Sequence, residues 1–333
     1  MKRAGGLYDL LAARENLRVA FWKAARGCRA SPACRRFAGR LDENLESLAA
    51  ELRAGDARPG RPHCFRIFEP KERVISAPPF RDRVLHHAII NVCEPHLERW
   101  LIADTSACRE GKGRLRALER ASRFARGQPW FLKMDVRKYF DSVSHDRLLA
   151  FLEKRFKDRR LLALLERIVR GHETSPGRGL PIGSLISQHL ANFYLGWLDR
   201  WVKETLRRVG YVRYMDDFAI WGSGAGDLGA VLAKVRAFLL DELDLALKDW
   251  PYVNRTAHGM DFLGFRIFPH GRVPNRASRR RFIRRCAALA SAWQRGEMSG
   301  LEFQQRTAAM IAFVREGDAR YLLRRVAAMA PTA

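Results

Sequence analysis

Three features are scarce in this sequence: cysteines at paired spacings, long apolar runs and acidic residues. Its six cysteines include no CxxC pair and no histidine partners at ligand spacing, which predicts reduced thiols rather than a disulfide framework or a zinc site. The first 27 residues carry no uninterrupted apolar segment, which predicts no secretory signal and a cytoplasmic location. The uncharged stretch 179–198 contains proline, serine, glutamine, histidine and asparagine, so we expect a buried turn and helix there and no membrane span.

Acidic residues are the scarce charge. The 333 residues contain 36 Asp and Glu against 61 Lys and Arg, a formal net charge of +25 at pH 7, which predicts a polyanionic partner. The cations are 50 Arg and 11 Lys, and arginine favours bidentate phosphate recognition and base stacking. A hydrophobic fraction of 47% excludes a disordered basic chain, and the length predicts two or three packed subdomains.

The first third of the chain is mostly helical by its apolar spacing. Leucines and phenylalanines recur every three or four residues over 7–56, and Gly55 with the run 58–62 ends this pattern. The period changes to two at 65–68 and 73–75, which predicts a basic hairpin with Lys71 and Glu72 in its turn. Residues 81–99 predict another helix, and a glycine-rich basic loop at 109–114 opens into a further one.

Strands that carry single carboxylates follow. The apolar run 130–136 contains Asp135 near its end, and 211–215 with 218–221 predict a β-hairpin whose turn displays Asp216 and Asp217. Residues 227–247 predict an amphipathic helix and 261–268 a strand, and the chain beyond Pro274 is arginine-rich and helical. Strands that alternate with helices indicate an α+β or α/β core.

The three aspartates suggest a metal site. An exposed Asp-Asp turn is the plainer interpretation of Asp216 and Asp217, because adjacent carboxylates repel unless a cation or solvent relieves them. Large apolar residues flank the pair, however, and Asp135 ends another apolar strand. Side-by-side strands would bring three carboxylates together, as Mg²⁺ requires, and in a basic protein this indicates two-metal phosphoryl transfer on nucleic acid.

Four motifs in order resemble those of reverse transcriptases. Tyr214-Met215-Asp216-Asp217 matches the YxDD motif, and 135–141 (DVRKYFD) resembles the preceding palm motif. The segment 179–188 (GLPIGSLISQ) resembles the motif between them, and 261–265 (DFLGF) the strand motif at the palm–thumb junction.

The middle motif narrows the resemblance. Reverse transcriptases of the group II intron type have QG-x₃-SP there, whereas Ile182-Gly183 and Ser187-Gln188 give the IG-x₃-SQ form, which resembles the enzymes of diversity-generating retroelements. Segments 15–17, 69–77, 81–88 and 107–113 also resemble that group. The stretch 307–314 lacks the Ser-Trp…His pattern of the group's thumb, so the resemblance is weaker there.

The resemblance implies an α+β right-hand polymerase fold in a bacterial or phage-encoded protein. It implies an N-terminal helical extension (1–60), fingers (61–130), a palm with an interleaved fingers segment (131–270) and a helical thumb (271–333), with no nuclease or maturase domain. The implied activity is RNA-directed DNA synthesis that copies a template-repeat RNA into adenine-mutagenised cDNA. A reverse transcriptase of phage defence is the alternative with the same chemistry, and a catalytically inactive RNA-binding protein is the alternative of another class.

Site roles follow from the same resemblance. Asp135, Asp216 and Asp217 are the expected catalytic carboxylates, and with the Val136 backbone they are expected to hold two Mg²⁺ ions, for which Mn²⁺ can substitute. Eight residues are expected to contact the incoming dNTP: Lys71, Arg73, Arg137, Phe140, Ile182, Gly183, Gln188 and Lys248.

Most of the dNTP roles have plainer alternatives. Phe140 is the expected sugar gate against a ribose 2′-hydroxyl, with core packing as its alternative. Lys71 and Arg73 are expected to bind the triphosphate, and the alternative for both is a solvated charged hairpin. Lys248 is a candidate proton donor to pyrophosphate. Ile182 replaces a glutamine of more accurate relatives, so discrimination should fall, because hydrogen-bonding sites reject mispairs better than apolar ones.

Nucleic-acid contacts complete the expectations. Arginines on more than one face of 276–285 predict phosphate contacts with a template–primer duplex, although a solvated helix is the usual explanation of a charge run. The expected contacts are Lys112, Tyr214, Met215, Arg276, Arg279, Arg280, Arg281 and Arg284. The implied partners are template RNA, the RNA/DNA duplex, dNTPs and an oligomer of a small basic accessory protein, with no membrane.

Overall fold

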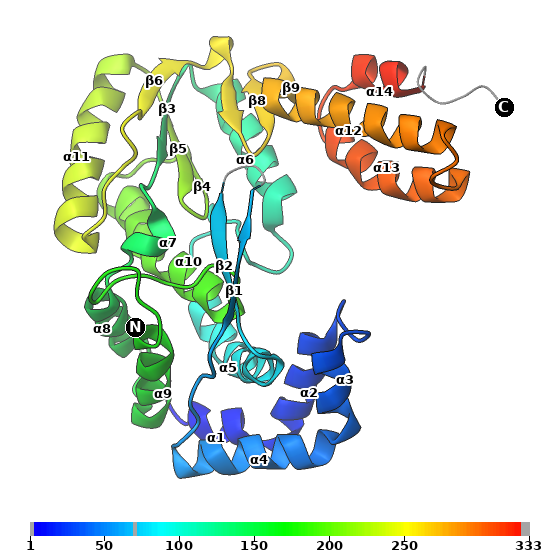
Figure 1. Cartoon of the computed structure of the whole chain (residues 1–333). Coiled ribbons are helices and arrows are strands. Elements are labelled where there is room, and N and C mark those ends of the chain that lie inside the picture. Colours follow the sequence, from blue (N-terminus) through cyan, green and yellow to red (C-terminus); the bar gives the residue numbers. More distant parts are fainter. Residues whose placement is uncertain (1–2, 69–71, 328–333) are drawn as a thin grey trace.

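The structure, a computed structural model, describes residues 3–68 and 72–327 (Figure 1). The N-terminal helices lie together at one end, where they pack on the long helix α5. Their bounds are α1 (Leu7–Ala12), α2 (Arg14–Ala25), α3 (Pro32–Gly39), α4 (Leu41–Ala54) and α5 (Phe80–Glu98). Ser31 caps α3 by accepting a hydrogen bond from the Cys34 amide, and Gly55 ends α4 at φ +79°. The predicted N-terminal helices are therefore confirmed.

The predicted basic hairpin is also confirmed. Strands β1 (His63–Ile67) and β2 (Arg73–Ala77) pair antiparallel, with Phe65 opposite Ile75. Lys71, expected in its turn, lies outside the described residues. The Ser76 amide donates a 2.7 Å hydrogen bond to the carbonyl of Ile182, so the hairpin is held against the loop before α10.

A four-stranded antiparallel sheet forms the centre of the molecule. Its order is β4-β5-β3-β6, with β3 at Trp130–Asp135, β4 at Tyr211–Tyr214, β5 at Asp217–Gly222 and β6 at Tyr252–Arg255. Alternate residues face two cores, as a period of two requires. Leu132 and Met134 join the main core with α10 (Leu185–Arg200) and α11 (Ala225–Leu243), whereas Phe131 joins a second core with α6 (Gly113–Gly127).

Shorter helices complete this part of the chain. They are α7 (Tyr139–Ser142), α8 (His145–Arg155), α9 (Arg159–Arg170), a π-helical turn (Trp201–Thr205) and a 3₁₀ turn (Thr256–His258). The helix predicted over 227–247 ends early, at Leu243, because Asp244 takes a left-handed φ of 52°. Leu247 instead forms an isolated bridge with Val136, which brings Lys248 to the end of β3.

The strand predicted over 261–268 is wrong as a single element. It is a hairpin of β7 (Met260–Phe262) and β8 (Phe265–Phe268), and β9 (Gly271–Pro274) completes a three-stranded sheet. Leu263 and Gly264, at φ 49° and 89°, form a two-residue turn with positive φ at both positions. Periodicity could not show this turn, because leucine rarely adopts such a φ.

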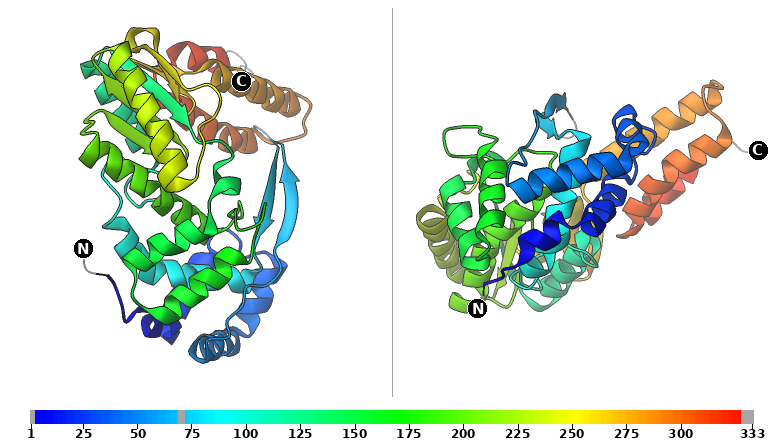
Figure 2. Two further views of the ribbon diagram at one scale, coloured as in Figure 1. Left: turned by 90° about the vertical axis from the view of Figure 1, so that its left-hand side faces the viewer. Right: turned by 90° about the horizontal axis from the view of Figure 1, so that it is seen from below.

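The helices after Pro274 project from the sheet as a separate group (Figures 1 and 2). They are α12 (Arg276–Gln294), α13 (Gly300–Arg315) and α14 (Arg320–Ala327). Asn275 caps α12, and Ser299 with Glu302 forms a capping box on α13. Phe282, Cys286, Val314, Ala319 and Leu322 form a small core of their own. The predicted C-terminal helices are confirmed.

The prediction for the uncharged stretch of the chain is confirmed. The uncharged stretch 179–198 forms a turn followed by the largely buried α10, as expected. Among the described residues, no helix is long and apolar enough to cross a membrane. All six cysteines are free thiols.

Substituting Gly264 by alanine is expected to lower the free energy of unfolding by about 1–3 kcal/mol. Its φ is left-handed, and a Cβ would approach Phe313 Cζ to 2.9 Å and Ser278 Oγ to 3.0 Å. Gly271→Ala, at the first residue of β9 after the next hairpin turn, is the control, because a Cβ there meets no atom within 4 Å. Urea denaturation measures both variants, and equal losses would contradict this account of the turn.

Candidate active site

The pairing of β3 with β5 brings carboxylates together at one end of the central sheet. Asp135 ends β3 and lies opposite Asp217, the first residue of β5. Asp216 lies in the two-residue turn before it, after Met215 at φ +54°, and its carbonyl accepts a 3.1 Å hydrogen bond from the Val136 amide. The predicted hairpin is confirmed, with the refinement that Asp217 belongs to the strand and not to the turn.

Two lysines offset part of the negative charge of the three carboxylates. Lys248 Nζ lies 2.6 Å from Asp135 Oδ1, and Lys133 forms an ion pair with Asp217. Burial raises the pKa of Asp216 above its ordinary value, and the charge of Asp135 raises it further. Burial lowers the pKa of Lys133 to about 7. The carboxylates thus repel one another in a partly buried place, where an added cation would be favoured.

The donor set suits a hard divalent cation. As the side chains lie, no three His, Cys, Asp or Glu residues in the described part of the chain form a group that could hold a metal ion. A metal at the three aspartates would have to displace the lysines that Asp135 and Asp217 contact. Carboxylate oxygens are the ligands that Mg²⁺ prefers. Burial and, after it, the charge of Asp135 raise the pKa of Asp216, and a bound cation would offset both effects. Asp135, Asp216 and Asp217 would hold it, and a part for the Val136 carbonyl stays a prediction.

A large hollow lies between β2, the loop before α10 and the segment after α11. It has a volume of about 980 Å³, and its lining includes Arg73 from β2, Ile182 from the loop before α10, and Ala246. The Ala246 carbonyl accepts a 2.8 Å hydrogen bond from the amide of Arg137, two residues beyond Asp135. The structure thus brings two of the expected dNTP contacts, Arg73 and Ile182, to one cavity, whose lining does not include the three aspartates.

Two other expected dNTP contacts, Gly183 and Phe140, adjoin residues of this lining without belonging to it. Gly183 has φ +108°, and a Cβ there would lie 2.7 Å from Ile75 Cγ2, so glycine allows the hairpin to approach this loop. Phe140 is half-buried against the main core, and its carbonyl accepts a 2.8 Å hydrogen bond from Leu180, a residue of the lining. The centroid of its ring lies 5.8 Å from that of Tyr139, so ring packing also holds Phe140 in its position.

The remaining dNTP candidates lie elsewhere. Gln188 accepts a hydrogen bond from the Cys108 thiol at 3.6 Å and lines a separate hollow of about 220 Å³ with His86 and Gly183. Lys248 is engaged by Asp135, and Lys71 lies outside the described residues. The structure therefore does not bring all eight expected contacts to one cavity.

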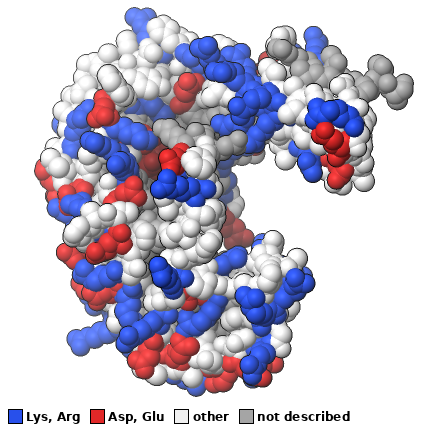
Figure 3. All heavy atoms as spheres, viewed as in Figure 1, with Lys and Arg blue, Asp and Glu red and all other residues white. Residues whose placement is uncertain are grey.

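The residues expected to contact nucleic acid differ in whether their side chains are already bonded within the protein. Arg276, Arg279, Arg280, Arg281 and Arg284 are exposed on α12, and in the described part of the chain none has a side-chain hydrogen bond or ion pair. Figure 3 shows this face hollowed between the N-terminal helices and the C-terminal helices, with Lys and Arg along its upper rim. Lys112 instead donates to the Ala103 carbonyl at 3.1 Å, and Tyr214 is half-buried in the second core.

Several residues that matter to this site were missed by sequence reasoning. Lys133 pairs with Asp217 and lies 5.1 Å from the Phe262 ring. Arg213 is fully buried and donates to the carbonyl of Met215 in the turn. Both are charged residues inside apolar strands, which was the signal that could have found them.

Comparison with known proteins establishes the family. The family model for "Reverse transcriptase (RNA-dependent DNA polymerase)" matches residues 68–267, and the chain belongs to this family. Telomerase from Candida tropicalis, solved with a TWJ fragment of telomeric RNA, aligns with 86% of this chain and 58% of its own at a TM-score of 0.50 and 10% identity. The expected α+β right-hand polymerase fold is confirmed.

Several curated relatives are similar to part of this chain, and two of them extend well beyond the aligned region. Protein YkfC of Escherichia coli is 25% identical over 280 residues, which are 68% of this chain and 72% of YkfC. The uncharacterized 91 kDa protein in the cob intron of Schizosaccharomyces pombe is 26% identical over 51% of this chain. The group II intron-encoded protein LtrA of Lactococcus lactis is 25% identical over 49% of this chain. The alignments span only 22% and 29% of those two proteins.

Substituting Lys248 by methionine is expected to tighten Mn²⁺ binding. The ion pair with Asp135 competes with a metal, and a partly exposed pair of this kind contributes on the order of 1 kcal/mol, or roughly fivefold in affinity. Isothermal titration with Mn²⁺ measures the change. Lys248→Arg keeps the charge and serves as the control. Affinity in the methionine variant that is equal to or weaker than that of the wild type would contradict the competition.

Proposed function

We propose that this chain is itself an active RNA-dependent DNA polymerase. The observation that carries the proposal is the convergence of Asp135, Asp216 and Asp217 at one end of the sheet. A hollow of about 980 Å³ is lined by Lys138, three residues beyond Asp135, and by Ala246. A catalytically inactive RNA-binding protein would have no need of three like charges in a partly buried place, because their repulsion destabilises the fold.

The residues around the carboxylates suit a nucleotide. Two bound Mg²⁺ ions would lower the pKa of a primer 3′-hydroxyl and neutralise the triphosphate. Arg73 is exposed on β2 and lines the hollow, so its guanidinium is available to phosphate oxygens. Phe140 as a sugar gate and Lys71 as a second phosphate contact remain part of the proposal.

The template and primer are proposed to lie across the hollowed face. Five of the exposed arginines of α12 have no partner within the described residues, and phosphate groups would supply one: Arg276, Arg279, Arg280, Arg281 and Arg284. This placement needs no base-specific contact, as suits an enzyme that copies changing sequences.

The biological role that we propose is sequence diversification by a retroelement. In it a template-repeat RNA is copied into adenine-mutagenised cDNA, with a small basic accessory protein as an oligomeric partner. The IG-x₃-SQ form at Ile182 supports this role, because Ile182 lines the hollow and offers no hydrogen bond there. A phage-defence enzyme shares the chemistry. A template repeat, a variable repeat and an accessory gene in neighbouring DNA favour the first role, and their absence favours the second.

Asp216→Ala is expected to lower primer extension on an RNA template at least roughly 100-fold, the loss typical when one preorganised electrostatic group leaves an active site. The measurement is dNTP incorporation with and without Mg²⁺. Asp249→Ala is the control, because Asp249 is an exposed carboxylate just after Lys248. Metal-dependent synthesis that persists in Asp216→Ala would refute the assignment of the site.

Ile182→Gln is expected to lower misincorporation opposite template adenine by roughly three- to tenfold, because a polar side chain at this point of the hollow restores a hydrogen-bonding check on pair geometry. Sequencing of cDNA made on an adenine-rich template gives the error spectrum. Ile182→Leu stays apolar and should leave the spectrum as it is. If glutamine also leaves it unchanged, Ile182 does not determine fidelity.

A further inference from the structure

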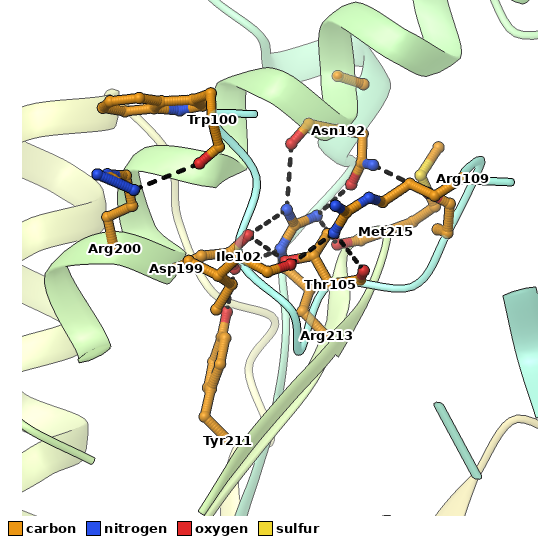
Figure 4. Close-up of polar contacts among 12 residues, drawn as sticks. Trp100, Ile102, Thr105, Arg109, Asn192, Asp199, Arg200, Tyr211, Arg213 and Met215 are labelled. Carbon is orange, nitrogen blue, oxygen red and sulfur yellow. Dashed lines mark hydrogen bonds and ion pairs between the residues drawn. The ribbon is translucent and has the colours of Figure 1, made fainter. Parts of the chain in front are cut away.

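A fully buried ion pair lies behind the turn that carries Asp216. The side chains of Arg213, on β4, and Asp199, on α10, have no solvent exposure. Figure 4 shows Arg213 between Asp199, Asn192 and Met215, and Tyr211 and Thr105 also donate hydrogen bonds to Asp199. None of these five partners except Met215 was expected to act at the site.

The guanidinium of Arg213 uses all five of its N–H donors. Nε and Nη2 donate to the two oxygens of Asp199, each at 2.6 Å. Nη2 also donates to the Asn192 carbonyl at 3.1 Å, and Nη1 donates to Asn192 Oδ1 at 3.0 Å and to the Met215 carbonyl at 2.9 Å. Because every donor is occupied, the guanidinium has one orientation, and that orientation fixes the Met215 carbonyl.

The partners of Arg213 are fixed in turn. Asp199 also accepts hydrogen bonds at 2.5 Å from the Tyr211 hydroxyl and from the Thr105 hydroxyl, so each of its oxygens has two donors. The Asn192 amide donates to the Ala107 carbonyl at 2.9 Å, which turns its oxygen toward Arg213. The network is therefore satisfied throughout, as a buried polar network must be if it is to define one structure.

Met215 is the residue for which this rigidity matters. It occupies the first central position of a two-residue hairpin turn with φ +54°, where glycine is the usual residue. A bulky side chain in that region is strained by on the order of 1 kcal/mol or more, and such strain persists only where the surroundings hold it. The next residue is Asp216, so a turn that relaxed would move this carboxylate away from Asp135.

We propose that Arg213 is a positioning residue which, through the Met215 carbonyl, sets the place of the Asp216 carboxylate, with Asp199 and Asn192 as the groups that orient it. The proposal rests on the proposed polymerase function. Stability alone does not explain the pair, because a buried ion pair is often no more stabilising than apolar residues of similar volume. A geometric task explains why the network ends on the turn.

Arg213→Lys tests the proposal against Tyr211→Phe. Lysine keeps the charge beside Asp199, but it cannot donate to Asp199, Asn192 and Met215 together. Tyr211→Phe removes one hydrogen bond to the same Asp199 and leaves the bond to Met215 in place. The readouts are kcat and KM for dNTP in primer extension, Mn²⁺ affinity by isothermal titration, and the midpoint of thermal unfolding.

Both variants should unfold at lower temperature than the wild type. Arg213→Lys should also lower kcat roughly 10- to 100-fold, as expected for a small misplacement of a reacting group, and weaken Mn²⁺ binding, with KM little changed. Tyr211→Phe should keep both properties within about threefold, since it removes a bond to Asp199 but none of the hydrogen bonds that Arg213 donates. A folded Arg213→Lys protein with wild-type kcat and Mn²⁺ affinity overturns the proposal, and so do equal losses in the two variants.

If Arg213→Lys does not fold, Asn192→Ala takes its place, because it removes the acceptor that shares Nη1 with the Met215 carbonyl. It should lower kcat and Mn²⁺ affinity, and unchanged values overturn the proposal. The wild type separates the two levels of inference. A wild-type chain without DNA synthesis refutes the proposed function, whereas active wild type with an unaffected network variant refutes only the role of Arg213.

Discussion

Electrostatic repulsion among the carboxylates of Asp135, Asp216 and Asp217 is the constraint on which the rest of the site depends. Three like charges at the end of a buried sheet are unfavourable, and the raised pKa of Asp216 reflects both its burial and the charge of Asp135. The fold meets this repulsion with Lys133 and Lys248, one from the same strand as Asp135 and one from the segment after α11. Both lysines contact carboxylates that a metal would also contact. Their positive charges therefore offset part of the carboxylate charge when no metal is bound.

The surrounding elements keep this cluster in place. The loop before α10 is tied to the hairpin by the bond from Ser76 to Ile182, and to α8 by His145, whose ring nitrogen bonds the Gly179 carbonyl at 2.7 Å. Arg178 holds the same loop to Asp244. The hollow that Ile182 and Arg73 line is therefore bounded by segments that are fixed from several sides, although the hairpin strand itself is exposed.

Much of this could be predicted from sequence, because the informative patterns are local. Periods of two and near four gave β3, the β4–β5 hairpin and the C-terminal helices, and isolated carboxylates in apolar strands marked the site. Predictions failed where a left-handed residue ends or turns an element. Asp244 stops α11 at Leu243, and Leu263 with Gly264 splits the expected strand 261–268. The partner of Arg213 was also out of reach, since Asp199 lies on a helix that only the tertiary fold brings beside β4.

The arginine content of the chain has two separate causes. Some of the 50 arginines serve as multiple donors to backbone carbonyls inside the protein: Arg155 to His96, Arg83 to Ala24, and Arg109 to Ile102 and Thr105. These side chains satisfy carbonyls where the chain leaves a helix or crosses a loop, a task suited to a forked guanidinium and less to lysine. Net charge alone therefore overstates the surface that is available to nucleic acid. Arg276, Arg279, Arg280, Arg281 and Arg284 of α12 are exposed and have no partner within the described residues, so they are one part of the charge that a polyanion would pair.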